Sequence, residues 1–290
     1  MNRIKHFALI SCSFSFLFIQ GCKETPVSQE RTPAPEIYAW DLAGWDCVWH
    51  DEFDSAFIDT SQWDFEVNGW GGGNHELQYY TDRAVNAYTE DGSLVIQALE
   101  EPYTGPDGTR QYTSARLRTR FKGDWKYGRF DIYAKLPFGQ GLWPAIWMLP
   151  TDWVYGGWAA SGEIDIMELL GHQPNRVYGT LHYGGVPPDN THTGSVFTLP
   201  NGSFSSDYHL FTLIWEPNKF EWLVDDTLYL TQTEWYTHAV GYPAPFDQRF
   251  HLLLNIAVGG DWPGSPNATT VWPQQMLVDY VRVYQLPAEN

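Results

Sequence analysis

Three carboxylates lie within six residues of one another, in the segment GEIDIME at 162–168. Alternate side chains of a β-strand face the same side, so Glu163 and Asp165 share a face. Glu168 falls on the other face of a regular strand, and one extra residue, a β-bulge at 166–167, would return it to the first face. Acids crowded on one face repel each other, so at least one should hold its proton tightly. Hydrolysis of a glycosidic bond by paired carboxyls needs one ionised and one protonated group.

Acidic clusters of this kind have two other common explanations. Carboxylate oxygens bind calcium ions, and many groups of acids are solvated surface with no further role. The motif alone leaves these alternatives open, so the rest of the chain has to decide between them.

The elements that must position the acids are predicted to be strands. Residues 129–136 alternate polar and apolar side chains, as a half-buried strand does, and VDDT at 224–227 is typical of a hairpin turn. No segment shows a long helical period. The predicted fold class is therefore all-β, a β-jelly-roll sandwich of two curved antiparallel sheets with a concave substrate cleft. Further strand-like runs are residues 93–99, 211–215, 220–224, 227–231, 250–258 and 277–286.

The first residues have the composition of an export signal. A short basic region precedes an apolar run at 7–19, which is shorter than the roughly 20 residues that span a membrane. The run leads to Cys22, placed as in a bacterial lipoprotein processing site, although Gln20 is not the usual small residue there. We expect residues 1–21 to be a lipoprotein-type signal peptide and Cys22 to carry the lipid that anchors the chain to a membrane. An ordinary signal peptide cut nearby is the alternative.

Beyond the signal the chain divides into a spacer and one large domain. Residues 22–37 are rich in Pro, Thr, Ser and charged side chains, which predicts a flexible linker, and residues 38–290 suit a single domain. With Cys12 removed and Cys22 acylated, Cys47 is the remaining cysteine, so we expect no disulfide and a core-packing role for Cys47. We expect an exported, monomeric protein of the cell envelope.

Composition narrows the class of substrate. The formal net charge is −18, which argues against nucleic acid and anionic polymers as partners. The chain holds 15 Trp, many beside Gly or Pro, and indole rings offer flat faces on which the C–H faces of sugars stack. Half or more of these Trp are expected to serve the core or anchor loops. The composition therefore favours a neutral carbohydrate.

A series of ordered motifs now matches a known family. The chain resembles glycoside hydrolase family 16, and within it the laminarinase-like endo-β-1,3-glucanases, from about Trp49 to Tyr284. The resemblance implies a β-jelly roll with an open cleft, and the bulged acid motif, with Met167 as its extra residue, is the form found in laminarinases, agarases and carrageenases. The motifs are WHDEFD (49–54), GGGNHELQYYT (71–81), SARLRTR (114–120), YGRFDIYAKLP (127–137), GLWPAIWMLP (141–150), GEIDIME (162–168), LHYGG (181–185), LLLNIAVGGDWPG (252–264) and VDYVRVYQ (278–285).

The resemblance implies a role for each acid. Glu163 would be the nucleophile that forms a glycosyl-enzyme intermediate, and Glu168 would protonate the leaving oxygen and then deprotonate water. Asp165 would orient the nucleophile and tune the ionisation of both. This is double displacement with retained configuration.

The resemblance also implies residues that bind sugar. Trp143 and Trp147 are four apart, so a regular strand puts both on one face. His182 is expected near Glu168 or the bound sugar, and the alternative for Arg116 is an ion pair on a strand face. Asp261 stands where the family pattern has Asn, which leaves the neighbouring subsite open. The substrate-binding candidates are Asn74, Arg116, Trp143, Trp147, Trp158, His182 and Trp262.

A structural calcium ion is implied as well, away from the chemistry. The residues in question are Glu52, the backbone carbonyl of Gly92, and Asp279, whose oxygens suit Ca²⁺. No cofactor is expected for catalysis.

The function predicted is a retaining endo-β-1,3-glucanase that acts on laminarin-like β-glucan, with mixed-linkage β-1,3-1,4-glucan as a further substrate. The alternatives are another family 16 hydrolase, agarase-like or carrageenase-like, and a non-catalytic β-glucan-binding module. The few basic residues, 17 Lys plus Arg, favour a neutral glucan over a sulfated galactan. All three acids are present at motif spacing, which disfavours a binding module.

Overall fold

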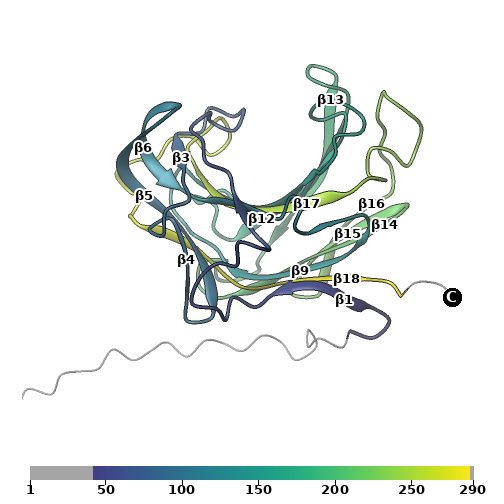
Figure 1. The fold of residues 1–290 in the computed structure, drawn as a ribbon, viewed down its shortest axis with the longest axis horizontal. Helices are drawn as coiled ribbons and strands as arrows, with labels where there is room; N and C mark the ends of the chain where they lie inside the picture. Colours follow the sequence, from purple (N-terminus) through teal and green to yellow (C-terminus); the bar gives the residue numbers. More distant parts are fainter. Residues whose placement is uncertain (1–41, 288–290) are drawn as a thin grey trace, which may run out of the picture. The chain divides into compact units, whose positions relative to one another are not determined.

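The computed structural model describes residues 42–287. The predicted signal peptide, Cys22, the linker and the first four residues of the predicted domain lie outside that range. The described chain folds into strands packed as two sheets (Figure 1). Within it, no helix is long and apolar enough to cross a membrane.

Ten strands form the outer sheet of the sandwich. β1 (Asp46–Asp51) pairs with β18, and β4 (Ala87–Glu90) pairs with β5. Pairing within this sheet is antiparallel apart from the parallel contact between β3 and β6. The main path runs β16 (Thr227–Gln232), β15 (Lys219–Val224), β14 (His209–Glu216), β9 (Gly128–Lys135), β18 (Gln274–Gln285), β5 (Ser93–Gly105), β6 (Gly108–Ser114) and β3 (Gln78–Tyr80).

Eight strands form the inner sheet. Its main path runs β13 (Asn190–Thr198), β12 (Arg176–Gly184), β11 (Glu163–Glu168), β10 (Leu142–Pro150), β17 (Phe250–Val258), β7 (Arg116–Arg118) and β2 (Asp64–Phe65), with β8 (Asp124–Trp125) paired to β17. Figure 1 shows β12 and β17 in a layer above β9 and β18, with β13 rising at one end and β3 and β6 at the other. The two curved sheets confirm the predicted jelly-roll sandwich.

The predicted strand runs are confirmed, with small changes at their ends. The run predicted at 250–258 is β17 itself, and the run at 93–99 continues to Gly105. The hairpin turn predicted at 224–227 joins β15 to β16 through Asp225 and Asp226, both with positive φ (45° and 63°), as the tightest hairpin turns require.

Two predictions about burial are wrong. β9 is buried on both faces instead of one, because its polar side chains find partners in the outer sheet. The Nε of Arg129 donates to both oxygens of Asp131 at 2.9 Å, and the Thr212 hydroxyl donates to Asp131 at 2.7 Å. Paired charges of this kind tolerate burial. Cys47 is half-buried on β1 and not part of the core, because β1 lies at the margin of the outer sheet, paired with β18 alone.

One tryptophan of the outer sheet supports the strand that carries the acids. Trp222, on β15, is fully buried, and its indole N–H donates to the backbone carbonyl of Asp165 at 2.9 Å. Gly179, on β12, lies against the same ring: a Cβ there would come within 2.6 Å of Trp222 Cδ1 and of the Tyr229 hydroxyl. The absence of a side chain at Gly179 is therefore what lets Trp222 reach β11.

We predict that Gly179→Ala lowers the free energy of unfolding by about 1–3 kcal/mol, because the added methyl group must displace Trp222 or Tyr229. Thermal unfolding would show a melting temperature lower by about 2–4 °C for each kcal/mol lost. Gly241→Ala is the matched control, since a Cβ at Gly241 meets nothing within 4 Å. Equal stability of the two variants would contradict this account of the packing.

Candidate active site

The bulge predicted in the acid strand is present. On one side of β11, Ile146 and Trp147 of β10 pair with Met167 and Asp165, so that Ile166 is passed over. On the other side the register with β12 also shifts between Asp165 and Glu168. Ile166 and Met167 are both buried in the core. The extra residue returns Glu168 to the face that carries Glu163, as predicted from the alternation of side chains.

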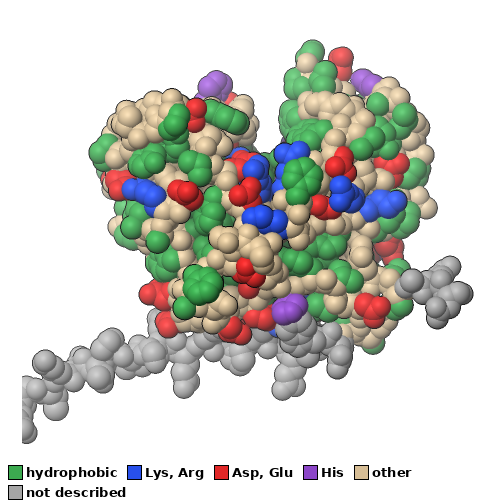
Figure 2. All heavy atoms as spheres, viewed as in Figure 1, with side chains coloured by type: hydrophobic (Ala, Val, Ile, Leu, Met, Phe, Trp, Pro, Cys, Tyr) green, Lys and Arg blue, Asp and Glu red, His purple; other side chains and the backbone are tan. Residues whose placement is uncertain are grey.

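The acids lie in the middle of a cleft on the concave face. Figure 2 shows the molecule hollowed between two lobes, which in Figure 1 carry β3 and β6 on one side and β13 on the other. One arm of the cleft, with a volume of about 880 Å³, runs over β12 and β13 and is called the β13 arm. The other, of about 550 Å³, runs toward β7 and is called the β7 arm. Both arms are lined by Asn74, Trp143, Trp158, Glu163 and Glu168.

Indole N–H groups hold the two glutamates. Trp158 donates to Glu163 Oε2 at 3.0 Å, and Trp143 donates to Glu168 Oε1 at 3.0 Å. Each hydrogen bond fixes one carboxylate oxygen and leaves the other to face the cleft. Trp143 and Trp158 therefore both orient the acids and line the site, so Trp158, predicted to bind sugar, also contacts Glu163 directly.

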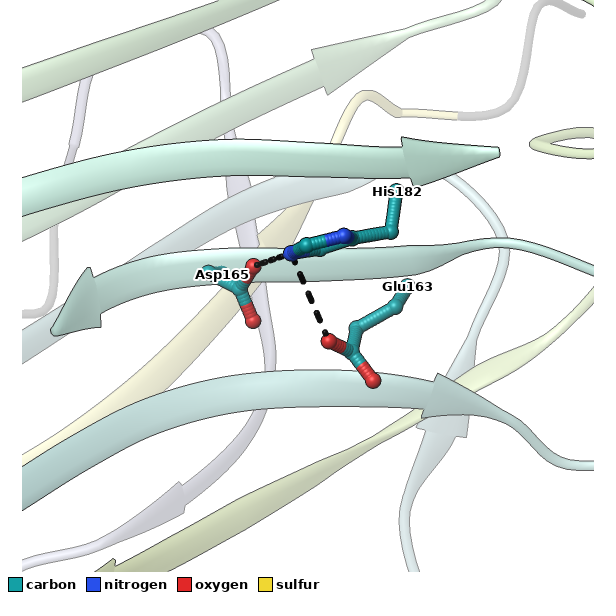
Figure 3. A group of neighbouring side chains, drawn as sticks. All are labelled: Glu163, Asp165 and His182. Carbon is teal, nitrogen blue, oxygen red and sulfur yellow. Dashed lines mark ion pairs between the residues drawn. The ribbon is translucent and has the colours of Figure 1, made fainter. Parts of the chain in front are cut away.

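His182 lies beside the first two acids of the strand. Its Nε2 is 3.2 Å from Asp165 Oδ2 and 3.8 Å from Glu163 Oε1 (Figure 3). The prediction from the sequence placed this ring near Glu168 or the sugar. His182 is the cross-strand partner of Glu163 in the β11–β12 ladder, which explains why it meets Glu163 and Asp165.

The three carboxyls share a buried, mutually repulsive environment. Burial raises the pKa of Glu163 to about 8, and the charge of Asp165 adds to the rise. Burial likewise raises the pKa of Asp165, and of Glu168 with a contribution from Asp165, to about 8. Such a group gives up its protons as a coupled unit. Glu163 and Glu168 each receive an indole N–H and each lie near enough to His182 for its charge to lower the pKa, so these contacts favour the ionised form of both glutamates.

The β7 arm contains an ion-pair network around Arg116. The guanidinium lies 3.3 Å from Glu66 and 3.6 Å from Glu76, and donates to the Tyr80 hydroxyl at 3.2 Å. It also lies over the ring of Trp147, 5.2 Å from the centroid. The ion pair expected as the alternative for Arg116 is therefore present, and Arg116 still lines the cleft.

The remaining predicted sugar contacts also lie in the cleft. Trp147 lines the β7 arm with its indole N–H bound to Asn255 at 2.8 Å. Trp262 is 42% exposed in the β13 arm, with its ring against Trp143 at 5.5 Å between centroids. Asp261, which departs from the family pattern, pairs instead with His75 at 2.9 Å. All seven residues predicted to bind sugar therefore line the two arms of one cleft.

Some residues of the site were missed in the sequence. Asn255 is the lone uncharged amide in the otherwise apolar run LLLNIAV, and that isolation in a buried strand was a usable signal. Tyr178 lies against Trp262 at 5.0 Å, and His192 lies against His182 at 5.5 Å between ring centroids. Both belong to cross-strand neighbourhoods that depend on strand order, for which the sequence carried no signal.

The expected calcium ligands lie at one corner of the outer sheet. Pairing of Asp51 with Val281 and of Leu94 with Val278 brings the backbone at Glu52, Gly92 and Asp279 to the same region. Asp279 is buried, but both oxygens of Glu52 already accept hydrogen bonds from Arg282, at 2.9 and 2.8 Å. Strand pairing thus brings the three residues to one region of the sheet, while the engagement of Glu52 by Arg282 opposes its use as a ligand.

Comparison with known proteins places the chain among polysaccharide-cleaving enzymes. Residues 78–282 match the family model described as "Glycosyl hydrolases family 16". The chain is 45% identical over 262 residues to "Glucan endo-1,3-beta-glucosidase A1" of Niallia circulans, covering 84% of this chain and 38% of that protein. It is 47% identical over 256 residues to "Beta-glucanase" of Rhodothermus marinus, covering 83% of this chain and 85% of that protein.

A solved structure supports the same grouping. The catalytic domain of an endo-1,3-beta-glucanase (laminarinase) from Thermotoga petrophila RKU-1 superposes with a TM-score of 0.76 at 44% identity. The match covers 84% of this chain and 98% of that domain. The fold described above is therefore that of a known catalytic domain.

The raised pKa of Asp165 predicts how stability depends on pH. Its pKa rises from an ordinary value of 3.8 to about 8 in the folded chain, so the folded chain binds this proton more tightly than the unfolded chain does. The free energy of unfolding therefore falls as pH rises between those two values.

We predict that Asp165→Asn reduces the fall in melting temperature between about pH 5 and pH 8, since the amide has no proton to lose. Each kcal/mol regained at the upper pH would raise the melting temperature by about 2–4 °C. Asp82→Asn, at an exposed acid, serves as the control. Parallel pH profiles for the wild type and Asp165→Asn would show that Asp165 does not hold its proton in the folded chain.

Proposed function

Since this chain belongs to glycosyl hydrolases family 16, we propose that it is a retaining endo-β-1,3-glucanase that cleaves laminarin-like β-glucans. The observation that carries the proposal is the bulge in β11, which sets Glu163 and Glu168 on one face at the point where the two arms of the cleft meet. A cleft that continues on both sides of the acids suits cleavage within a chain. The match to the Niallia circulans relative covers only 38% of that protein. The activity is therefore proposed for this chain on the basis of the residues in its own site.

In the first step, ionised Glu163 attacks the anomeric carbon while protonated Glu168 gives its proton to the leaving oxygen. The Trp158 N–H on Glu163 Oε2 leaves Oε1 to form the bond to carbon. The Trp143 N–H on Glu168 Oε1 leaves Oε2 to carry the proton. The products are a glycosyl ester on Glu163 and a shortened glucan with a free hydroxyl.

In the second step, ionised Glu168 takes a proton from water as the water attacks the anomeric carbon and frees Glu163. Two displacements restore the original configuration. Asp165, kept neutral by burial, can donate its proton in a hydrogen bond to Glu163 and so hold the nucleophile in place. The same intermediate passes its sugar to another glucan where an acceptor outcompetes water.

The charges of the cleft favour a neutral polysaccharide. Among the described residues that line the two arms, Arg116 is the one Lys or Arg, and it is already paired with Glu66 and Glu76. A sulfated galactan would meet mostly carboxylates there, which repel it. The exposed indole ring of Trp262 offers a face on which an uncharged sugar ring can stack. The half-buried indoles of Trp143 and Trp158 add apolar surface to the same cleft. β-1,3-glucan, with mixed-linkage glucan second, is therefore preferred to agar or carrageenan.

Replacing the two glutamates should separate their roles. We predict that Glu163→Gln lowers kcat on laminarin by at least about 10³-fold with the fold intact, because the amide cannot form the glycosyl ester. Glu168→Gln should lose comparable activity on laminarin but retain far more on an aryl β-glucoside oligomer whose leaving group needs no proton.

Reducing-end release and circular dichroism would measure activity and folding in parallel. Glu221→Gln, on β15 and ion-paired with Lys219, is the control and should keep full activity. Substantial turnover by Glu163→Gln would rule out Glu163 as the nucleophile. Cleavage of agarose or κ-carrageenan in place of laminarin would favour the alternative hydrolase, and binding of laminarin without cleavage would favour the binding module.

The position of the enzyme in the cell is part of the proposal. Cys22 follows the apolar run as in a lipoprotein, and a lipid on it would tether the monomeric domain to a membrane of the envelope. We predict that Cys22→Ser moves the protein from the membrane fraction to the soluble fraction with its hydrolysis rate unchanged. Equal membrane association of both forms would contradict the anchor.

A structural calcium ion held by Gly92, Asp279 and Glu52 is also proposed, on the outer sheet away from the acids. Calcium would supply a charge that offsets buried Asp279, and Glu52 would have to exchange its contact with Arg282 for the ion. We predict that a calcium chelator lowers the melting temperature of the wild type and has less effect on Asp279→Asn. No change in the wild type would contradict the site.

A further inference from the structure

Three side chains of the cleft form a group with metal-ligand spacing. Glu163, Asp165 and His182 each offer one ligand atom, and these atoms all lie within 4.8 Å of one another. Figure 3 shows one oxygen of each carboxylate of β11 turned toward the imidazole nitrogen of His182 on the adjacent strand β12. Within residues 42–287 this is the one group of three His, Cys, Asp or Glu side chains with such spacing.

The burial of Asp165 gives an independent reason to expect a ligand. Only 3% of its side chain is exposed. Its Oδ2 accepts no hydrogen bond from the described residues and points at His182 Nε2, 3.2 Å away. When Asp165 is ionised and His182 Nε2 carries no proton, this oxygen has no donor, which costs free energy, and either a proton or a cation at that point would remove the cost.

We propose that Glu163, Asp165 and His182 form a binding site for Zn²⁺ in the catalytic cleft. Imidazole nitrogen and carboxylate oxygen are both zinc ligands, and three protein ligands with a fourth position open to solvent are the usual arrangement where zinc meets a cleft. The ligand atoms are His182 Nε2, Asp165 Oδ2 and Glu163 Oε1. The fourth position faces the substrate channel that Glu163 lines.

The spacing of these atoms agrees with tetrahedral zinc. Zinc binds nitrogen and oxygen at about 2.0–2.2 Å, so two ligands of one tetrahedral ion lie about 3.4 Å apart. His182 Nε2 is 3.2 Å from Asp165 Oδ2 and 3.8 Å from Glu163 Oε1, and all three ligand atoms lie within 4.8 Å of one another, so binding requires the carboxylates to close on the ion by small side-chain shifts. Calcium needs six or more oxygen ligands, and this group offers two carboxylates and a nitrogen.

The hydrogen bonds around the group support the same occupant. The Trp158 N–H donates to Glu163 Oε2, so Oε1 is left directed at His182. A hydrogen-bond donor of this kind fixes the orientation of a carboxylate that binds a metal ion. A divalent cation would also offset two carboxylate charges that otherwise repel each other in a buried place. Glu168 stands outside the group, with its Oε1 held by Trp143.

Zinc at this place would inhibit hydrolysis, because its ligand Glu163 Oε1 is the atom that attacks the sugar. Inhibition would compete with glucan, since both occupy the same position in the cleft. The inhibition rests on the proposed function, whereas the binding of zinc does not. An experiment can therefore contradict the inhibition by zinc without contradicting the binding of zinc.

Binding is tested by isothermal titration of ZnCl₂ into the wild type, His182→Asn and His192→Asn at one pH. We expect one equivalent that binds the wild type at least about tenfold more tightly than His182→Asn. His192→Asn is the matched control: it removes a neighbouring imidazole, 5.5 Å from His182, that is not in the group. Zinc bound by Cys47 or by exposed histidines other than His192 is common to all three proteins and cancels in the comparison. Asp165→Asn, which keeps the side-chain shape, should lose affinity as His182→Asn does.

Equal affinity of the wild type and His182→Asn, or an equal loss in His192→Asn, would overturn the site. In laminarin hydrolysis, zinc should raise KM with little change in kcat, the effect should vanish on adding EDTA, and the same concentration of CaCl₂ should have none. Loss of binding in His182→Asn together with hydrolysis unaffected by zinc would leave the metal site standing. It would overturn Glu163 as the nucleophile.

Discussion

The catalytic arrangement depends on one irregularity in one strand, the bulge in β11. Strand side chains alternate with a period of two, and Glu168 is five positions after Glu163, so a regular strand would bury one glutamate in the core. The extra residue moves Glu168 to the cleft and leaves Ile166 and Met167 under it as core side chains. The Trp222 indole supports the strand at the bulge by donating to the Asp165 carbonyl, and Gly179 makes room for that ring.

The same arrangement costs stability and provides reactivity. Burial of the three carboxyls opposes their ionisation, so a proton stays available within the group for the leaving oxygen. Indole N–H groups are suited to this site because they donate without adding charge, and their rings line the cleft as well. The large apolar core beneath, in which all nine positions of β17 are buried, offsets the cost.

Local patterns in the sequence were enough to predict the strands, the jelly roll and the bulge. The alternation of side chains around Glu163 required an extra residue before Glu168, and the aspartates at 225 and 226 required a tight turn. Contacts between distant strands were not predictable in this way. Asp131 of β9 is buried because it accepts hydrogen bonds from its neighbour Arg129 and from Thr212 of β14, and Trp222 reaches β11 from the other sheet. Such pairs depend on strand order, to which no periodicity of the chain corresponds.

The central claim is that Glu163 and Glu168, set on one face by the bulge, cleave β-1,3-glucan by two displacements. Proton NMR of a short laminari-oligosaccharide in the first minutes of hydrolysis reports the configuration of the new reducing end directly. The account predicts that the β-anomer appears first and that the α-anomer follows only by mutarotation. Initial release of the α-anomer would mean a single displacement by water and would contradict the role given to Glu163.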